Sequence, residues 1–253
     1  MKGLTALALL AATTQVSAET VRFVTCPVYR DADSGKKSGC WLAEDRTSGR
    51  RYDVSLAPSK PDWNHEVLVE GETASAPATP CGDPALDPVR TSILPGSCTR
   101  QMLPAEGYPG RKFVLPQRNV APMAVARIAP PGPYSARTFH LLYDFDADFL
   151  IYQYDDYFLD AAITWLRAAR PRAITVTGYA ATIAATVSGH LLAEDPGIAR
   201  RRAEKTTEAL VRLGVDPKII TTRWRRAAAA VNIPEADGLA EASRRRVDIA
   251  AIP

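Results

Sequence analysis

The sequence predicts an α+β protein with two domains: a small disulfide-bonded all-β domain, then a domain with helices on one face of a mixed sheet. Three observations predict this class. Short alternating segments fill residues 19–107, prolines are dense over residues 108–136, and strand and helix patterns alternate over residues 137–253. A chain of 253 residues is long enough to form two separate cores.

The first 18 residues have the pattern of a cleavable export signal. Lys2 precedes an apolar run over residues 4–12, and the small-residue triplet Val16-Ser17-Ala18 predicts cleavage after Ala18. The run is too short to span a bilayer, and no later segment is apolar enough to do so. Cys26 lies too far beyond the run to be a lipidated first residue. We therefore expect the mature protein to be exported.

Residues 19–107 read as short strands broken by turns, with Ser48-Gly49 at the turn of a hairpin. The strand-like segments are residues 21–29, 40–45, 46–56, 66–74 and 87–96. This number of strands predicts a barrel or a sandwich, with an OB-like barrel as one form. Trp41, Tyr52 and Trp63 fit either an aromatic binding face or a core.

The domain also holds all four cysteines, Cys26, Cys40, Cys81 and Cys98. An even number in an exported chain predicts two disulfides, and three pairings are open. We favour Cys26–Cys40 with Cys81–Cys98, because these close local loops. The spacings match no metal-binding knuckle and the three histidines are far apart, so we expect neither metal nor cofactor.

Residues 108–136 form the predicted linker, which ends in Pro130-Pro131-Gly132-Pro133 and should be extended, because proline disrupts helices and central strands. The elements expected after it have the order β-α-β-α-β-β. They are a strand opening at residue 137, a helix over 155–170, a strand over 173–179, a helix over 194–214, and strands over 218–224 and 245–252. Asp195 is the expected N-cap of the second helix, with Pro196 at its first position and Gly214 as its stop.

Four segments of residues 137–253 together resemble the OmpA-like peptidoglycan-binding domain of Gram-negative cell envelopes. They read HLLYDFDADFL, ITVTGYAA, ARRRAEKTTEALVRLGV and SRRRVDI, and they follow the family's order. The second matches the strand that ends in Gly-His-Thr-Asp in the family, and the third matches its Leu-Ser-x-x-Arg-Ala helix. The resemblance covers a little under half of the chain, and we recognise no family in the amino-terminal half.

The resemblance implies a domain that binds the zwitterionic diaminopimelate of the peptidoglycan stem peptide. An acid would contact the ligand ammonium and a forked arginine its carboxylate. Arg202 matches the family's arginine, whereas Ala181 stands where the family has its aspartate. Two further departures are a longer loop between Gly178 and Arg202, and Arg244 in place of the usual asparagine.

Because the acid is missing, three interpretations stay open. In the first, the domain binds peptidoglycan with Glu194 as substitute acid, and Gly178, Tyr179 and Arg246 complete the site. We expect attachment to the cell wall to require that the Arg202 guanidinium faces an open pocket. In the second, the arginines at 200–202 and 244–246 cluster and bind another anion. In the third, the OmpA-like domain no longer binds peptidoglycan and the β domain contacts another envelope protein.

We do not expect an enzyme. The only residue groups with the character of a catalytic pair are His65 with Asp62 or Glu66, and His140 with Asp144. No nucleophile, metalloprotease or phosphate-loop motif is present. We do not expect nucleic acid as a partner either, because export would remove the chain from it.

Overall fold

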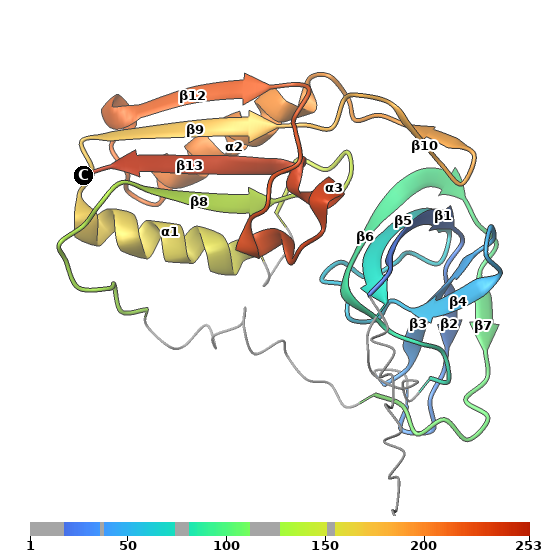
Figure 1. Ribbon diagram of the computed structural model, residues 1–253. Helices are drawn as coiled ribbons and strands as arrows, with labels where there is room; N and C mark the ends of the chain where they lie inside the picture. Colours follow the sequence, from blue (N-terminus) through green and yellow to red (C-terminus); the bar gives the residue numbers. More distant parts are fainter. Residues whose placement is uncertain (1–17, 36–37, 74–80, 112–126, 151–154) are drawn as a thin grey trace, which may run out of the picture.

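The computed structural model describes residues 18–35, 38–73, 81–111, 127–150 and 155–253. All but the last residue of the predicted export signal, and residues 112–126 of the predicted linker, lie outside this part. The described residues form two domains that pack against each other (Figure 1). In the described ranges, no helix is both long enough and apolar enough to cross a membrane.

The amino-terminal domain consists of two separate sheets with the strand orders β1-β5-β6 and β4-β3-β2-β7. Their strands are β1 (Thr20–Thr25), β2 (Val28–Arg30), β3 (Cys40–Asp45), β4 (Arg50–Asp53), β5 (His65–Thr73), β6 (Leu86–Ser97) and β7 (Gln101–Leu103). The sequence left a barrel or a sandwich open, and two separate sheets correspond to a sandwich. The β3–β4 hairpin turns at Gly49, whose positive φ of 68° suits glycine, as the Ser48-Gly49 pair predicted.

Strand β5 is buried on both faces, and its alternation explains how the domain is built. Val67 and Val69 belong to the core between the two sheets. Leu68 points the other way, into a cluster with Phe145 of the carboxy-terminal domain. The same strand therefore serves the β-domain core and the contact between the domains.

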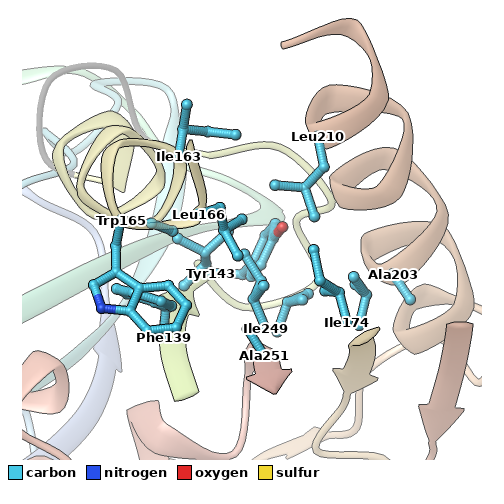
Figure 2. Close-up of a cluster of buried hydrophobic side chains, with 14 residues drawn as sticks. Phe139, Tyr143, Ile163, Trp165, Leu166, Ile174, Ala203, Leu210, Ile249 and Ala251 are labelled. Carbon is cyan, nitrogen blue, oxygen red and sulfur yellow. The ribbon is translucent and has the colours of Figure 1, made fainter. Parts of the chain in front are cut away.

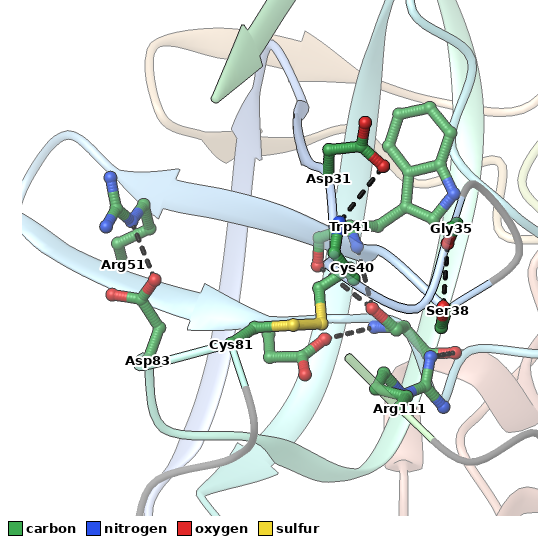
Figure 3. The surroundings of a disulfide bond; sticks show 12 residues. Asp31, Gly35, Ser38, Cys40, Trp41, Arg51, Cys81, Asp83 and Arg111 are labelled. Atoms are coloured by element: carbon green, nitrogen blue, oxygen red, sulfur yellow. Dashed lines mark hydrogen bonds and ion pairs between the residues drawn. A yellow bond between two sulfur atoms is a disulfide. The ribbon is translucent and has the colours of Figure 1, made fainter. Parts of the chain in front are cut away.

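The disulfides are Cys26–Cys98 and Cys40–Cys81, so the pairing of neighbouring cysteines that we favoured is wrong. The Cα atoms are 5.7 and 6.2 Å apart, and the bonds join residues 72 and 41 positions apart in the chain. Cys26 follows β1 and Cys98 follows β6, and both strands pair with β5. Sheet pairing, which spacing does not reveal, brings these ends together. Figure 3 shows the Cys40–Cys81 bond beside strand β3.

The carboxy-terminal domain has the predicted β-α-β-α-β-β order, with a sheet in the order β12-β9-β13-β8. Its main elements are β8 (Arg137–Leu142), α1 (Asp155–Ala169), β9 (Ala173–Tyr179), α2 (Ile198–Arg212), β12 (Ile220–Arg225) and β13 (Arg246–Ile252). Strands β12 and β9 are parallel and the other pairs antiparallel. Both helices cover one face of the sheet, and Trp165, Leu210 and Ile249 lie in the core between them (Figure 2).

Several short elements were not predicted. The loop from β9 to α2 contains a hairpin, β10 (Ala185–Val187) and β11 (His190–Leu192), and the chain before β13 contains α3 (Ala240–Ser243) and the short turns η1 (Pro217–Ile219) and η2 (Pro234–Ala236). Helix α2 begins at Ile198 with Gly197 as its N-cap, so the assignment of Asp195 as N-cap is wrong. The Asp195 carboxylate instead accepts a bond from the Gly197 amide, 2.6 Å away, and tightens the turn before the helix.

Candidate functional site

Arg202 lies on the buried face of α2, close to the end of strand β9. The helix approaches the strand closely because β9 has Gly178 at this point. A Cβ atom at Gly178 would lie 2.0 Å from the carbonyl oxygen of Ala199, a distance that no side chain tolerates. Gly178 therefore positions Arg202 by allowing close packing, which is a different role from the ligand contact that we predicted.

The Arg202 side chain is fully buried, and its guanidinium is occupied by Glu194. Nη2 lies 2.6 Å from Glu194 Oε1 and Nη1 lies 3.2 Å from Glu194 Oε2. The guanidinium also donates to the backbone carbonyls of Ala147, Tyr179 and Asp144, at 2.7, 2.9 and 3.2 Å. Every nitrogen of the fork thus has an acceptor from the protein itself.

Glu194 is equally well bonded. Its Oε2 accepts from the amide of Ala181 at 2.6 Å and its Oε1 from the amide of Asp146 at 2.9 Å. The carboxylate therefore contacts Arg202 as a bound ligand carboxylate would. Ala181 contributes its backbone amide to this position.

The expectation that Arg202 faces an open pocket is therefore wrong. The long loop after β9 brings Glu194 back onto the arginine and closes the position from within the chain. Glu194 does lie at the site, as predicted, but it is bound to the arginine rather than free to contact a ligand ammonium.

Tyr179 and Arg246 lie together, but on the other side of the sheet from Arg202. The Arg246 guanidinium stacks 4.0 Å from the Tyr179 ring. It donates to the Ser243 carbonyl at 2.8 Å and to the Asp248 carboxylate at 2.9 Å. Burial, and next the charge of Asp248, raise the pKa of the Tyr179 hydroxyl. Only the backbone carbonyl of Tyr179 reaches Arg202.

The arginines at 200–202 and 244–246 do not form the cluster that the second interpretation required, because each has its own partner. Arg200 pairs with Glu204, Arg201 with Asp148 and Asp195, and Arg244 with Glu241. Arg245 is also paired, but its partner belongs to the other domain.

Arg245 and Glu70 form a buried ion pair between the two domains. Both side chains are almost fully buried, and both guanidinium nitrogens donate to the carboxylate, with Nη1–Oε1 at 3.2 Å. Arg22 adds a contact to Glu70 at 3.1 Å. Burial favours the neutral acid, but Arg245 and then Arg22 outweigh it and lower the pKa of Glu70. Sequence reasoning missed this site, although a glutamate within the apolar run VLVE is a signal for a buried partner.

Further contacts between the domains come from the unpredicted hairpin. Val187 and Leu192 pack against Val24 and Leu94 of the β domain. The Val24 amide donates to the Ser188 hydroxyl at 3.0 Å. In Figure 1 the hairpin segment extends from the sheet over β1 and β6.

Two polar contacts join the start of the carboxy-terminal domain to the β domain. The Phe145 amide donates to the Ser92 hydroxyl at 2.8 Å, and Ser59 bonds the carboxylate of Asp144. Burial raises the pKa of Asp144. Together with the ion pair, these contacts fix the two domains to each other.

One group of side chains in the described part of the chain has the spacing of a metal site: Cys40, Cys81 and Asp53. Both sulfur atoms belong to the disulfide, so neither can supply a thiolate. Of the predicted aromatic face, Tyr52 is buried in the core, whereas Trp41 and Trp63 are half-buried and pack edge to face, 5.1 Å apart.

The fold and the closed arginine position define the class of domain: an α+β domain with the sheet order β12-β9-β13-β8, whose buried arginine on α2 is paired with its own glutamate. No family model matches the chain, and no curated protein matches it. Several solved structures, however, do match this chain.

The solved structures include the peptidoglycan-associated lipoprotein from Burkholderia pseudomallei, at 22% identity and a TM-score of 0.34 over 45% of this chain and 89% of that one. The OmpA-like domain of FopA1 from Francisella tularensis subsp. tularensis SCHU S4 has 18% identity and a TM-score of 0.36 over 56% and 94%. The cell wall anchor of the T6SS from Pseudomonas aeruginosa has 18% identity and a TM-score of 0.36 over 46% and 81%.

These are proteins of the kind that the sequence resemblance led us to expect. At such identities and TM-scores the likeness concerns the fold alone and carries no information on the ligand of this chain.

Proposed function

We propose that this chain is an exported cell-envelope protein that associates with anionic groups of the cell wall through exposed arginines, and does not enclose a diaminopimelate end at Arg202. The observation that carries the proposal is the buried Arg202–Glu194 pair. A ligand carboxylate could reach Arg202 only by displacing a carboxylate that already makes two contacts to the arginine and two to backbone amides.

The charge of the chain is consistent with this mode of contact. The formal net charge is +3, and exposed arginines on β12 leave part of the carboxy-terminal sheet basic. Cell-wall stem peptides carry carboxylates, and an attraction between exposed charges weakens as salt screens it. We assign no catalytic step to the protein. His140 bonds Asp248 at 2.7 Å rather than Asp144, and His65, at the start of β5, pairs with Asp62 at 3.0 Å.

The test is sedimentation of the mature protein with isolated sacculi, at low and high salt, with and without free diaminopimelate. We expect retention at low salt, release at high salt, and no effect of diaminopimelate. Retention that diaminopimelate abolishes would restore the Arg202 clamp and overturn the proposal.

A second candidate is a protein-interaction module in which the β domain contacts another envelope protein. The half-buried Trp41 and Trp63, with the Arg100 guanidinium 3.9 Å from the Trp63 ring, favour it, because aromatic residues and arginine are enriched in interfaces. Absence of retention on sacculi at any salt concentration would move the assignment to this candidate.

A further inference from the structure

An open groove of about 440 Å³ lies along the edge of the carboxy-terminal sheet. It is lined by residues of β9 and β12, namely Thr177, Tyr179, Thr222, Arg223, Trp224 and Arg225. Strand β12 is the edge strand of the sheet. The groove is separate from the buried Arg202–Glu194 pair, since Tyr179 turns its side chain towards Arg246 and only its carbonyl towards Arg202.

The strand register places both groove arginines on the face that the helices leave uncovered. Arg223 is the partner of Thr177 and Arg225 of Tyr179, while Trp224 is the partner of Gly178. Gly178 faces α2, so alternation puts the two arginines on the opposite face. Residues two apart on a strand lie about 7 Å apart, close enough for two guanidinium groups to reach one anion.

Both arginines are exposed, and among the described residues neither makes an ion pair or a side-chain hydrogen bond. This sets them apart from the arginines at 200–202 and 244–246, which are paired. Asp248 pairs with Thr177 in the sheet and so lies on this face, but it already bonds His140 at 2.7 Å and Arg246 at 2.9 Å. The groove therefore has an excess of positive charge.

Charges on an edge strand also protect a sheet against pairing with other chains, and this simpler role must be compared with binding. The hollow shape of the surface is a feature that protection does not require. Trp224 lies on the other face of the strand, where the Arg200 guanidinium stacks 5.4 Å from its ring, so its exposure does not distinguish binding from protection.

We propose that this groove binds a carboxylate or phosphate group of an envelope polymer or lipid, held between the guanidinium groups of Arg223 and Arg225. Each fork can donate two parallel N–H bonds to such an anion. The hydroxyl of Thr177, on the neighbouring strand, can supply a further donor. The inference rests on the proposed function and names the surface that would carry it.

The experiment compares the wild type with the double variant Arg223→Gln/Arg225→Gln. Both positions are exposed, so the variant should fold, which circular dichroism checks. The control is Arg212→Gln/Lys218→Gln, which removes the same charge from exposed positions beyond the groove. Three probes are used: inorganic phosphate followed by NMR, isolated sacculi, and phosphatidylcholine vesicles that contain lipid A.

We expect saturable shifts of the Thr177, Tyr179 and Arg225 amides with phosphate, and a loss of affinity of about tenfold or more in the groove variant. The control should change less than about twofold. Equal losses in both variants, or no loss in the groove variant, would overturn the site.

The two larger probes distinguish the source of the anion. Groove-dependent binding to sacculi identifies wall carboxylates, and groove-dependent binding to vesicles alone identifies lipid phosphate and removes the wall from the proposed function. If salt-sensitive binding to sacculi persists in the groove variant, the groove is not the binding site and the proposed function stands. If the wild type binds none of the probes, both the groove site and the proposed function are wrong.

Discussion

Replacing Glu194 with alanine tests whether this carboxylate occupies a position that an external carboxylate could fill. The substitution leaves the buried Arg202 guanidinium without its charged partner, and leaves the amides of Ala181 and Asp146 without acceptors. Removing one partner of a buried ion pair costs about 3–5 kcal/mol. We expect the lower part of this range, because Arg202 keeps three carbonyl acceptors and water can enter the space.

The measurement is urea unfolding followed by tryptophan fluorescence, with and without added sodium acetate. Acetate has the size and charge of the removed group. If it binds the variant with a Kd of about 10 mM, then about 100 mM acetate should restore about 1.4 kcal/mol of unfolding free energy. Sodium chloride at the same ionic strength controls for screening.

A matched control is Glu204→Ala on the same helix. Glu204 forms an exposed pair with Arg200 at 2.7 Å, so its loss should change the unfolding free energy by about 0.5 kcal/mol or less, and acetate should not restore it. The reasoning fails if Glu194→Ala is as stable as the wild type, or if acetate and chloride act equally on it.

Three further predictions concern stability. Glu70→Gln should lower the unfolding free energy by about 3–5 kcal/mol near neutral pH, because Arg245 would stay buried without a charged partner. The pKa of Glu70 is lowered in the fold, so this difference from the wild type should shrink as acid protonates the wild-type carboxylate. A difference that stays constant with pH would contradict this. Replacing Cys26 and Cys98 with serine should cost about 4 kcal/mol, measured by urea unfolding, since their bond closes 72 residues; an unchanged midpoint would refute it. Burial lowers the pKa of Lys60 from 10.5 to about 8, so NMR should find its midpoint near 8 and unfolding free energy should rise between those values, where the unfolded chain binds the extra proton.

The sequence was sufficient to predict the elements whose patterns are long enough to show a period. Strand β9 and helix α1 lie within a residue of their predicted ranges, because alternation and a helical stripe each extend over several residues. The hairpin β10–β11 was missed because its strands have three residues each, too few for alternation to be distinguished from a loop.

Contacts between distant parts of the chain were beyond sequence reasoning. The Arg245–Glu70 pair joins residues 175 positions apart, and nothing local to either residue identifies the other. The cysteine pairing failed for the same reason, since the order of strands in a sheet decides which ends meet. At the candidate site, the structure brings the predicted residues Arg202 and Glu194 together, but as partners of each other rather than around an open pocket. Burial of Arg202 depends on where the loop between β9 and α2 returns to the arginine.

The long loop after β9 takes part in two features of the structure, the contact between the domains and the closed arginine position. Its hairpin contacts the β domain through Val187 and Ser188, and the residues after the hairpin place Glu194 on Arg202. A ligand that displaced Glu194 would have to move the same segment that holds the two domains together. Ala181 is part of the same arrangement, because its backbone amide donates to the Glu194 carboxylate. One loop therefore both closes the arginine position and contacts the β domain.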